Sequence, residues 1–282
     1  MLRIAVYTQY YYLILYLYTQ LHIPHRSHSN RSLGTLYGIG VGPGDPDLIT
    51  LKALKRLRAA PVVAFPAGLE GRPGTAEKII QPWLSKQQTK LPLSFPYVLE
   101  AQTLEAAWHQ AAEAVWPYLQ TSDVVFACEG DISFYGTFTY LVQALQQQHP
   151  DVKTEVIAGV SSPMAAAAML GIPLTCQAER LAILPALYSL SDLEKTLDWA
   201  EVIVLMKVNR VYHQVWQILK QHQLLNQSYI VENATRSNQK LYVGLQNYPT
   251  LSLPYFSLLI IQCNQQRITM PSGASSLQTE VA

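Results

Sequence analysis

The sequence predicts an α/β protein of two domains, with a mainly parallel sheet in the first domain and a mixed sheet in the second. Each of three short apolar runs ends in a glycine-containing turn: Leu36–Val41 before Gly42, Val124–Cys128 before Glu129-Gly130-Asp131, and Val156-Ile157 before Gly159. A helical pattern follows each turn, as expected for parallel strands of an open sheet. Since ligands bind at the carboxyl ends of such strands, we expect the three turns to line one crevice.

Length and composition allow one large hydrophobic core or two of ordinary size. The chain has 282 residues, of which 49% are hydrophobic and 14% are charged, and two compact domains fit this length best. The formal net charge is +1, which provides no overall attraction to nucleic acid or to an anionic membrane. We therefore expect a small-molecule ligand, with neither nucleic acid nor membrane as a partner.

The three cysteines, Cys128, Cys176 and Cys263, lie far apart in otherwise apolar segments. Their spacing does not form the paired motif that holds a metal ion. Isolated thiols of this kind are typical of reduced cytoplasmic proteins. We therefore predict a cytoplasmic protein without a metal site.

The two ends of the chain differ in composition from its middle. Residues 1–32 contain a run of tyrosine, leucine and isoleucine, but polar Gln9, Thr19 and Gln20 limit it to less than the roughly 20 apolar residues that span a membrane. We interpret residues 1–32 as a leader or loose extension, or as the result of a start codon assigned too far upstream. Residues 265–282 are polar and are predicted to form a loose tail.

The first domain, predicted over residues 33–174, begins with the strand Leu36–Val41. Asp45 is typical of a helix N-cap and Pro46 of the first helical position, so we predict a helix there with Leu48, Leu51, Leu54 and Leu57 facing inward. The remaining predicted elements are a strand at Pro61–Phe65 ended by Pro66, a loop over 67–74, helices at Ala76–Lys86 and Leu104–Gln120, the strand Val124–Cys128, a helix at Phe134–Gln148, a strand near Thr154–Ile157, and a helix capped by Ser162 that ends at Leu170.

In the second domain, predicted over residues 175–264, strands and helices follow one another in a different order from that of the first domain. Three strands with two intervening helices are predicted: strands Leu181–Leu184, Val202–Met206 and Ser228–Val231, and helices Asp192–Trp199 and Val211–Leu224. The strands Lys240–Gly244 and Phe256–Gln262 follow with no helix between them. Strands joined without a helix favour antiparallel pairing, so we predict that these two form a ribbon.

The glycine-rich first turn does not match the common nucleotide-binding motifs. The dinucleotide fingerprint G-x-G-x-x-G requires a third glycine where this chain has Pro43 or Asp45. The sequence also contains neither a P-loop, nor a G-x-S-x-G hydrolase elbow, nor an H-E-x-x-H zinc motif. These absences weaken a dehydrogenase interpretation. The turns instead offer backbone groups, the hydroxyls of Ser161 and Ser162, and the carboxylate of Asp131, a combination that suits an adenosine joined to an amino acid through a sulfonium.

Three stretches resemble the signatures of the tetrapyrrole (corrin/porphyrin) methylase family, in the order in which the family carries them: Tyr37–Thr50 with its glycine turn, Glu129–Tyr135, and Ala158–Ser162. Ile132 and Ala158 depart from this pattern, because prolines are common at both points. The resemblance implies two α/β domains, S-adenosylmethionine bound in the cleft between them, and a homodimer.

The resemblance also implies which residues contact the methyl donor: Pro43, Gly130, Asp131, Phe134, Ser161, Ser162, Met206 and Ala234. Two of them have plain structural alternatives, since Met206 could belong to the core and Phe134 could lie on a helix face beside Phe138. Asp131 is a stronger candidate, because an acid at the end of a strand is costly to bury without a partner.

Within the family, the chain most resembles the methylases that act on C-20 of precorrin-2 or cobalt-precorrin-2 in cobalamin synthesis. Pro66 stands where methylases of uroporphyrinogen III usually carry an acid, which favours a different acceptor carbon. The substrate's carboxylates are expected to meet cationic side chains: Arg72, Lys78, Arg180, Lys207 and Arg236. No side chain is predicted to remove the proton, so the catalytic residues stay unassigned.

Two alternatives stay open. The first is another methylase of the family, whose substrate is a different corrin carbon, uroporphyrinogen III, a diphthamide or ribosomal RNA. The second is a non-catalytic tetrapyrrole-binding protein. The low net charge disfavours RNA.

Overall fold

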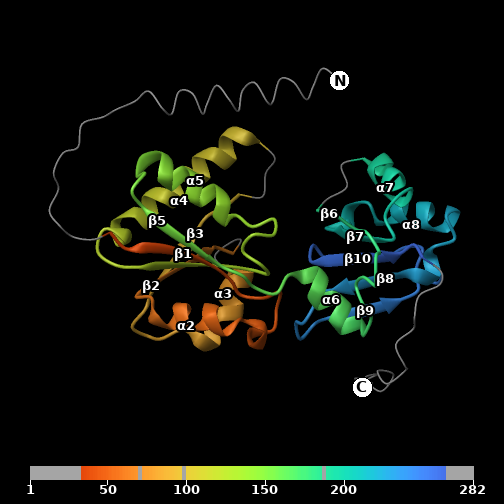
Figure 1. The fold of residues 1–282 in the computed structure, drawn as a ribbon, viewed down its shortest axis with the longest axis horizontal. Helices are drawn as coiled ribbons and strands as arrows, with labels where there is room; N and C mark the ends of the chain where they lie inside the picture. The colour runs from red at the N-terminus through yellow and green to blue at the C-terminus, as the bar shows by residue number, and fades with distance from the viewer. Residues whose placement is uncertain (1–32, 69–71, 97–99, 186–188, 265–282) are drawn as a thin grey trace. The chain divides into compact units, whose positions relative to one another are not determined.

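A computed structural model describes residues 33–68, 72–96, 100–185 and 189–264 (Figure 1). These residues form two five-stranded sheets with strand orders β3-β2-β4-β1-β5 and β6-β7-β10-β8-β9, which confirms the predicted α/β class. The predicted leader 1–32 and tail 265–282 lie outside the described residues. None of the described helices combines the length and the apolar character needed to cross a membrane.

The first sheet is parallel throughout. Its strands are β1 (Thr35–Gly40), β2 (Val62–Pro66), β3 (Thr89–Leu93), β4 (Val124–Cys128) and β5 (Lys153–Ile157). Strand β1 lies between β4 and β5, so the three strands that precede the glycine turns are parallel neighbours, as predicted. The sequence analysis missed β3, an edge strand whose mostly exposed side chains and Pro92 obscure the apolar pattern of a strand.

Helices cover both faces of this sheet (Figure 1). On one face, α2 (Leu51–Ala59) and α3 (Thr75–Ile80) pack against the inward side chains of β1 and β2. On the other face, α4 (Ala101–Leu119) and α5 (Phe138–Gln148) pack around Phe126 of β4. Because both faces are covered, the central strands β1, β2 and β4 are almost entirely apolar.

The first predicted helix is interrupted. Asp45 caps only the short 3₁₀ helix η1 (Pro46–Leu48), and α2 begins afterwards with Thr50 as its N-cap. The buried face of α2 runs through Ala53 and Leu57, whereas Leu51 is 75% exposed. The prediction that Leu51 faces inward was therefore wrong, because Ala53 and Leu57 are the residues of α2 that pack against the sheet.

Two other helix boundaries differ from the prediction. Helix α3 ends at Ile80 and continues as the 3₁₀ helix η3 (Gln81–Trp83), since Pro82 cannot extend an α-helix from its interior. Helix α5 begins at Phe138 rather than at Phe134. Phe134 therefore lies in the turn after β4, which overturns the alternative of a helix face shared with Phe138.

The second sheet is mixed, as predicted. Its strands are β6 (Leu181–Leu184), β7 (Val202–Met206), β8 (Ser228–Glu232), β9 (Lys240–Val243) and β10 (Ser257–Gln262); β6 and β7 are parallel and the other pairs antiparallel. The predicted ribbon of β9 and β10 is wrong, because β10 lies between β7 and β8. All six residues of β10 are buried, which suits a central strand, whereas β9 is largely exposed at the edge.

The described residues of the second half also form the helices α6 (Ser162–Leu170), α7 (Leu190–Leu197) and α8 (Tyr212–Gln221) and the 3₁₀ segments η4 (Val208–Arg210) and η5 (Leu225–Gln227). Helices α7 and α8 cover one face of the second sheet. On the other face, Ala166 and Ala167 of α6 pack against Val204 and Val231. Helix α6 thus joins the core of the second sheet although it precedes residue 174, the predicted domain boundary.

Candidate functional site

The glycine turns after β1 and β4 are joined directly by their backbones. The N–H of Gly42 donates to the carbonyl of Gly130 at 3.1 Å, and the N–H of Gly130 donates to the carbonyl of Gly42 at 2.7 Å. Both glycines have positive φ angles, +83° and +71°, which residues with a Cβ atom rarely adopt. The predicted convergence of these turns is therefore confirmed, and glycine is what allows it.

The turn after β5 joins the same edge. A Cβ atom added to Gly40 or to Gly159 would lie 2.7 Å from backbone atoms of the other residue, so only glycine lets these chains approach so closely. A Cβ atom added to Gly130 would meet only the carbonyl oxygen of Val160, at 4.0 Å. The backbone of Gly130 therefore faces open space in which a ligand can lie against it.

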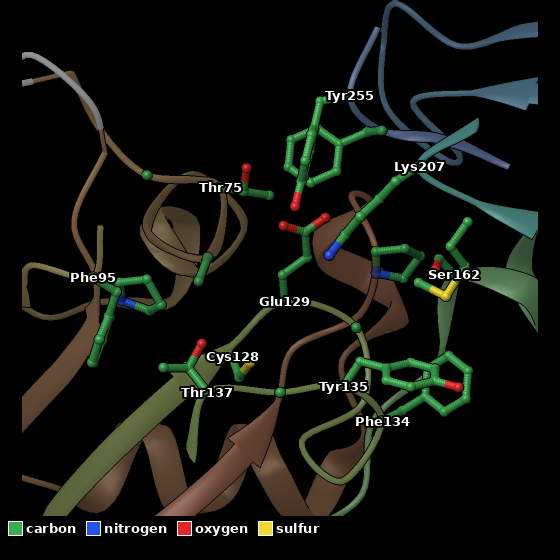
Figure 2. A pocket seen from close by; sticks show the side chains of 18 of the residues that line it. Thr75, Phe95, Cys128, Glu129, Phe134, Tyr135, Thr137, Ser162, Lys207 and Tyr255 are labelled. Atoms are coloured by element: carbon green, nitrogen blue, oxygen red, sulfur yellow. The ribbon is translucent and has the colours of Figure 1, made fainter. Parts of the chain in front are cut away.

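This open space belongs to a pocket of about 920 Å³ lined by residues of both sheets and their turns. Figure 2 shows part of its lining, with Phe134 and Tyr135 on one side and Thr75 and Phe95 on the other. The pocket brings together 11 of the 13 predicted site residues: Pro43, Gly130, Asp131, Phe134, Ser162, Met206, Ala234, Arg72, Lys78, Lys207 and Arg236.

Ser161 and Arg180 are not among the residues that line the pocket. The hydroxyl of Ser161 donates to the sulfur of Met164 at 2.8 Å, and Ser161, not Ser162 as predicted, is the N-cap residue of α6. Arg180 forms a two-pronged ion pair with Glu201, with its closest contact at 2.7 Å. The structure therefore does not bring Arg180 to the place where we expected it to meet substrate carboxylates.

Asp131 has partners within the protein. One oxygen of its carboxylate accepts from the backbone N–H and the hydroxyl of Ser133, and the other accepts from the N–H of Gly159 at 2.7 Å. Partial burial raises the pKa of Asp131, but these hydrogen bonds outweigh it and hold the pKa below its usual value. The argument that Asp131 needs a ligand to balance its charge is therefore wrong. Its carboxylate instead ties the second turn to the third.

Glu129 is the pocket residue whose chemistry the sequence analysis missed. Its carboxylate accepts a hydrogen bond from Arg236 at 2.6 Å and another from the Thr75 hydroxyl. Burial nevertheless dominates and raises the pKa of Glu129 to about 7. The sequence does show an acid directly before Gly130 at the end of a buried strand, which could have marked Glu129 as a candidate. Its partner Arg236, however, lies 107 residues away in the sequence.

Arg236 connects the second sheet to the turns of the first. Besides pairing with Glu129, it donates from Nε to the carbonyl of Pro43 at 3.3 Å, and its guanidinium lies 4.1 Å from the centre of the Phe256 ring. Its neighbour Thr235 has a φ of 65° and accepts from the N–H of Asp45 at 2.9 Å. A β-branched residue in this conformation is strained, and such strain concentrates at functional sites.

Lys207 follows β7 with a φ of 54°, and its ammonium lies 5.5 Å from the centre of the Tyr255 ring. Figure 2 shows the Lys207 side chain extending into the pocket toward Glu129. Arg72 and Lys78 line the same pocket from the first half of the chain. The pocket thus combines two carboxylates with several cations, an arrangement suited to an anionic ligand.

Aromatic and apolar side chains form another wall of the pocket. The rings of Trp108 and Tyr140 stack with centroids 4.3 Å apart, and Phe95 also lines this region. Cys128 lines the pocket too, but burial raises its pKa to about 12, so its thiol stays protonated and unreactive. In the part of the chain that the structure describes, no cluster of three histidine, cysteine or acidic residues could hold a metal ion.

A model of the tetrapyrrole (corrin/porphyrin) methylases matches residues 35–246, most of the described chain. This chain belongs to the tetrapyrrole methylase family. The match spans the three glycine turns, the first sheet, and the second sheet except β10. It therefore includes most of the pocket lining described above.

Relatives within the family have names from cobalamin synthesis. A precorrin-2 C(20)-methyltransferase of Sinorhizobium is 31% identical over 242 residues, which cover 83% of this chain and 97% of the relative. The cobalamin biosynthesis protein CobIJ of Mycobacterium tuberculosis is 32% identical over 243 residues, again 83% of this chain but 47% of CobIJ. This chain therefore spans about half the length of CobIJ.

A solved structure confirms the fold. Uroporphyrin-III C-methyltransferase of Thermus thermophilus, complexed with S-adenosylhomocysteine, aligns with a TM-score of 0.58 at 20% identity and covers 81% of this chain and 92% of its own. The two-domain α/β architecture predicted from the sequence is thus that of a tetrapyrrole methyltransferase.

Proposed function

We propose that this chain transfers a methyl group from S-adenosylmethionine to C-20 of precorrin-2 or cobalt-precorrin-2, a step of cobalamin synthesis. Family membership supports methyl transfer to a tetrapyrrole. The observation that carries the proposal is the pocket itself, in which the three glycine turns meet the ends of strands from the second sheet. The choice of C-20 is supported by similarity to the Sinorhizobium enzyme over nearly its whole length.

The proposed donor site is the part of the pocket in front of Gly130. The open space there lets a ligand lie against the backbone, and the predicted contacts Pro43, Phe134 and Ala234 line the same pocket. When bound, S-adenosylmethionine supplies a methyl group on a positively charged sulfur. Asp131 provides negative charge close to the backbone groups that would hold the donor, and it keeps the second and third turns in position.

The proposed acceptor site is formed by the aromatic wall and the cationic side chains. Trp108 and Tyr140 line the pocket and would provide flat apolar surface for a macrocycle. Lys78 and Lys207 line the same pocket, which supports the proposal that they meet its carboxylates. Holding the acceptor carbon in line with the methyl group, with water excluded, supplies most of the catalysis expected for a direct displacement.

Pro66 also supports an acceptor other than uroporphyrinogen III. It ends β2 and lines the pocket, and the resemblance places an acid at this position in methylases of uroporphyrinogen III. A proline side chain cannot carry a proton, so Pro66 cannot perform that acid's role.

Mass spectrometry and NMR of the product test the proposal. The full chain is incubated with S-adenosylmethionine labelled in its methyl group and with precorrin-2, with and without inserted cobalt. We expect one added methyl group, located at C-20. A methyl group at another carbon, or turnover of uroporphyrinogen III alone, would contradict the C-20 assignment. Binding without any turnover would favour a tetrapyrrole carrier. The homodimer implied by the resemblance remains a prediction, which light scattering tests.

A further inference from the structure

Methylation of a carbon that carries hydrogen must release a proton. The proposed reaction therefore needs a proton acceptor, and no residue has yet been assigned to this role. The C-20 carbon forms its new bond to the methyl group with its own π electrons, the sulfur–methyl bond breaks, and its electron pair stays on the sulfur. The substrate must then lose one proton to restore its conjugation. A side chain that accepts this proton must be a base, must reach into the pocket, and must be unprotonated at neutral pH.

We propose that the carboxylate of Glu129 accepts this proton and later releases it to water. The inference rests on the proposed function and adds a catalytic residue to it. Glu129 lies at the carboxyl end of β4, next to Gly130, against which we propose that the methyl donor lies. Figure 2 shows its carboxylate pointing into the pocket, with Thr75, Lys207 and Tyr255 directed toward it from three other segments.

Other ionisable groups of the described pocket lining are poorer proton acceptors. Asp131 is the only other carboxylate among the described lining residues, and the hydrogen bonds from Ser133 and Gly159 make it a weaker base. The thiol of Cys128 stays protonated. The lysine and arginine side chains of the lining are hydrogen-bond donors and offer no acceptor atom.

The surroundings of Glu129 suit a base that must also release its proton. Burial raises its pKa to about 7, while the charge of Arg236 and the hydrogen bonds from Arg236 and Thr75 limit the rise. Besides Arg236, the other titratable groups among the described lining residues of the pocket are Arg72, Lys78, Cys128, Asp131, Tyr135, Tyr140, Lys207 and Tyr255. A base with a pKa near the working pH combines a large unprotonated fraction with enough strength to take the proton.

Glu129→Gln and Glu129→Asp test the inference, with Glu113→Gln as the matched control, because Glu113 is exposed on α4 outside the pocket. Methyl transfer to precorrin-2 is measured under saturating donor and substrate from pH 5.5 to 8.5, donor affinity is measured by calorimetry, and the carboxyl stretch of Glu129 is titrated by infrared difference spectroscopy. We expect a wild-type kcat that rises through about pH 7 in step with the infrared titration.

In Glu129→Gln we expect kcat to fall about 100-fold or more, the usual range for loss of a general base, with donor affinity changed less than about twofold. Glu129→Asp should recover part of kcat and keep the pH dependence, while Glu113→Gln should match the wild type. A Glu129→Gln kcat within about threefold of the wild type would overturn this inference alone and leave the proposed function standing. Failure of the wild type to methylate precorrin-2 would overturn both.

Discussion

The carboxylate of Asp131 accepts a hydrogen bond from the backbone N–H of Gly159 at 2.7 Å. This contact joins the turn after β4 to the turn after β5 across the intervening strand β1. A single side chain thus holds the second and third turns together on the edge of the sheet where the pocket opens. The geometry of the proposed donor site depends on this bond, because the backbone groups that would grip the donor belong to the turns that it connects.

Asp131→Ala should weaken S-adenosylmethionine binding by about tenfold or more, since a charge-assisted hydrogen bond contributes about 1.5–3 kcal/mol. Calorimetry with the donor measures the change. Asp151→Ala is the control, because Asp151 is exposed near the opposite end of β5. Equal affinity of the wild type and Asp131→Ala would show that Asp131 does not support the donor site.

Glu129→Gln should change how stability depends on pH. Glu129 has a folded-state pKa of about 7, against an ordinary value of 4.5, so between these values the folded chain holds a proton that the unfolded chain has lost. Wild-type stability should therefore fall relative to Glu129→Gln as the pH rises from about 4.5 through about 7. The difference should become constant once the carboxyl is unprotonated in the folded chain as well.

The free energy of unfolding of the wild type should fall by about 2 kcal/mol relative to Glu129→Gln. This is less than the full pKa difference implies, because the Glu129 side chain is 28% exposed and solvent weakens the effect. Urea unfolding of both proteins from pH 4 to 8 measures it. Parallel stability curves across this range would mean that the carboxyl of Glu129 titrates as an ordinary exposed acid.

Gly130→Ala and Gly159→Ala should have different effects, the first on donor binding and the second on folding. A Cβ atom on Gly159 would overlap backbone atoms of Gly40 and Gly130, so Gly159→Ala should fold poorly or lose several kcal/mol of stability. A Cβ atom on Gly130 has room, and its main cost is the positive φ, about 1–2 kcal/mol. Gly130→Ala should therefore fold yet bind the donor weakly.

Thermal unfolding by circular dichroism and calorimetry with the donor separate the two glycine variants. Wild-type donor affinity in Gly130→Ala would argue that no ligand lies against this backbone. A Gly159→Ala chain as stable as the wild type would argue against the close packing of the turns after β1 and β5.

Lys207→Ala should raise the KM for precorrin-2 about five- to tenfold, because Lys207 lines the pocket and its loss would leave a substrate carboxylate without a cation. Arg180→Ala should leave KM within about twofold, since Arg180 is paired with Glu201 and does not line the pocket. Steady-state methyl transfer at fixed saturating donor measures both. A larger effect from Arg180→Ala would contradict the pocket boundary described for this chain.

Much of the site could be predicted from the sequence because its signals are local. Gly42, Gly130 and Gly159 stand where apolar runs end, and the need for positive φ or close backbone contact is expressed within a few residues. Strands β1 and β4 are short and mainly apolar, and β5 ends in the apolar pair Val156-Ile157 directly before its turn. Their parallel arrangement with adjacent turns was therefore predictable. The family resemblance then indicated which residues near these turns are expected to contact the methyl donor.

The predictions that failed depended on partners far away in the sequence. Strand β10 could not be placed between β7 and β8 from its own residues, because an all-apolar strand fits any central position of a sheet. Leu51 is exposed because the contacts of Ala53 and Leu57 with the sheet decide the rotation of α2.

The amino-acid sequence by itself determined the fold class and the three turns, since these rest on periodicity and turn chemistry within short segments. The family came from the resemblance of three motifs to its signatures. Only the tertiary structure decided the chemistry of Glu129, because burial and the pairing with Arg236, 107 positions away, set its pKa. The electrostatic environment of a side chain depends on every group that folding brings near it, and that set cannot be read from neighbours along the chain.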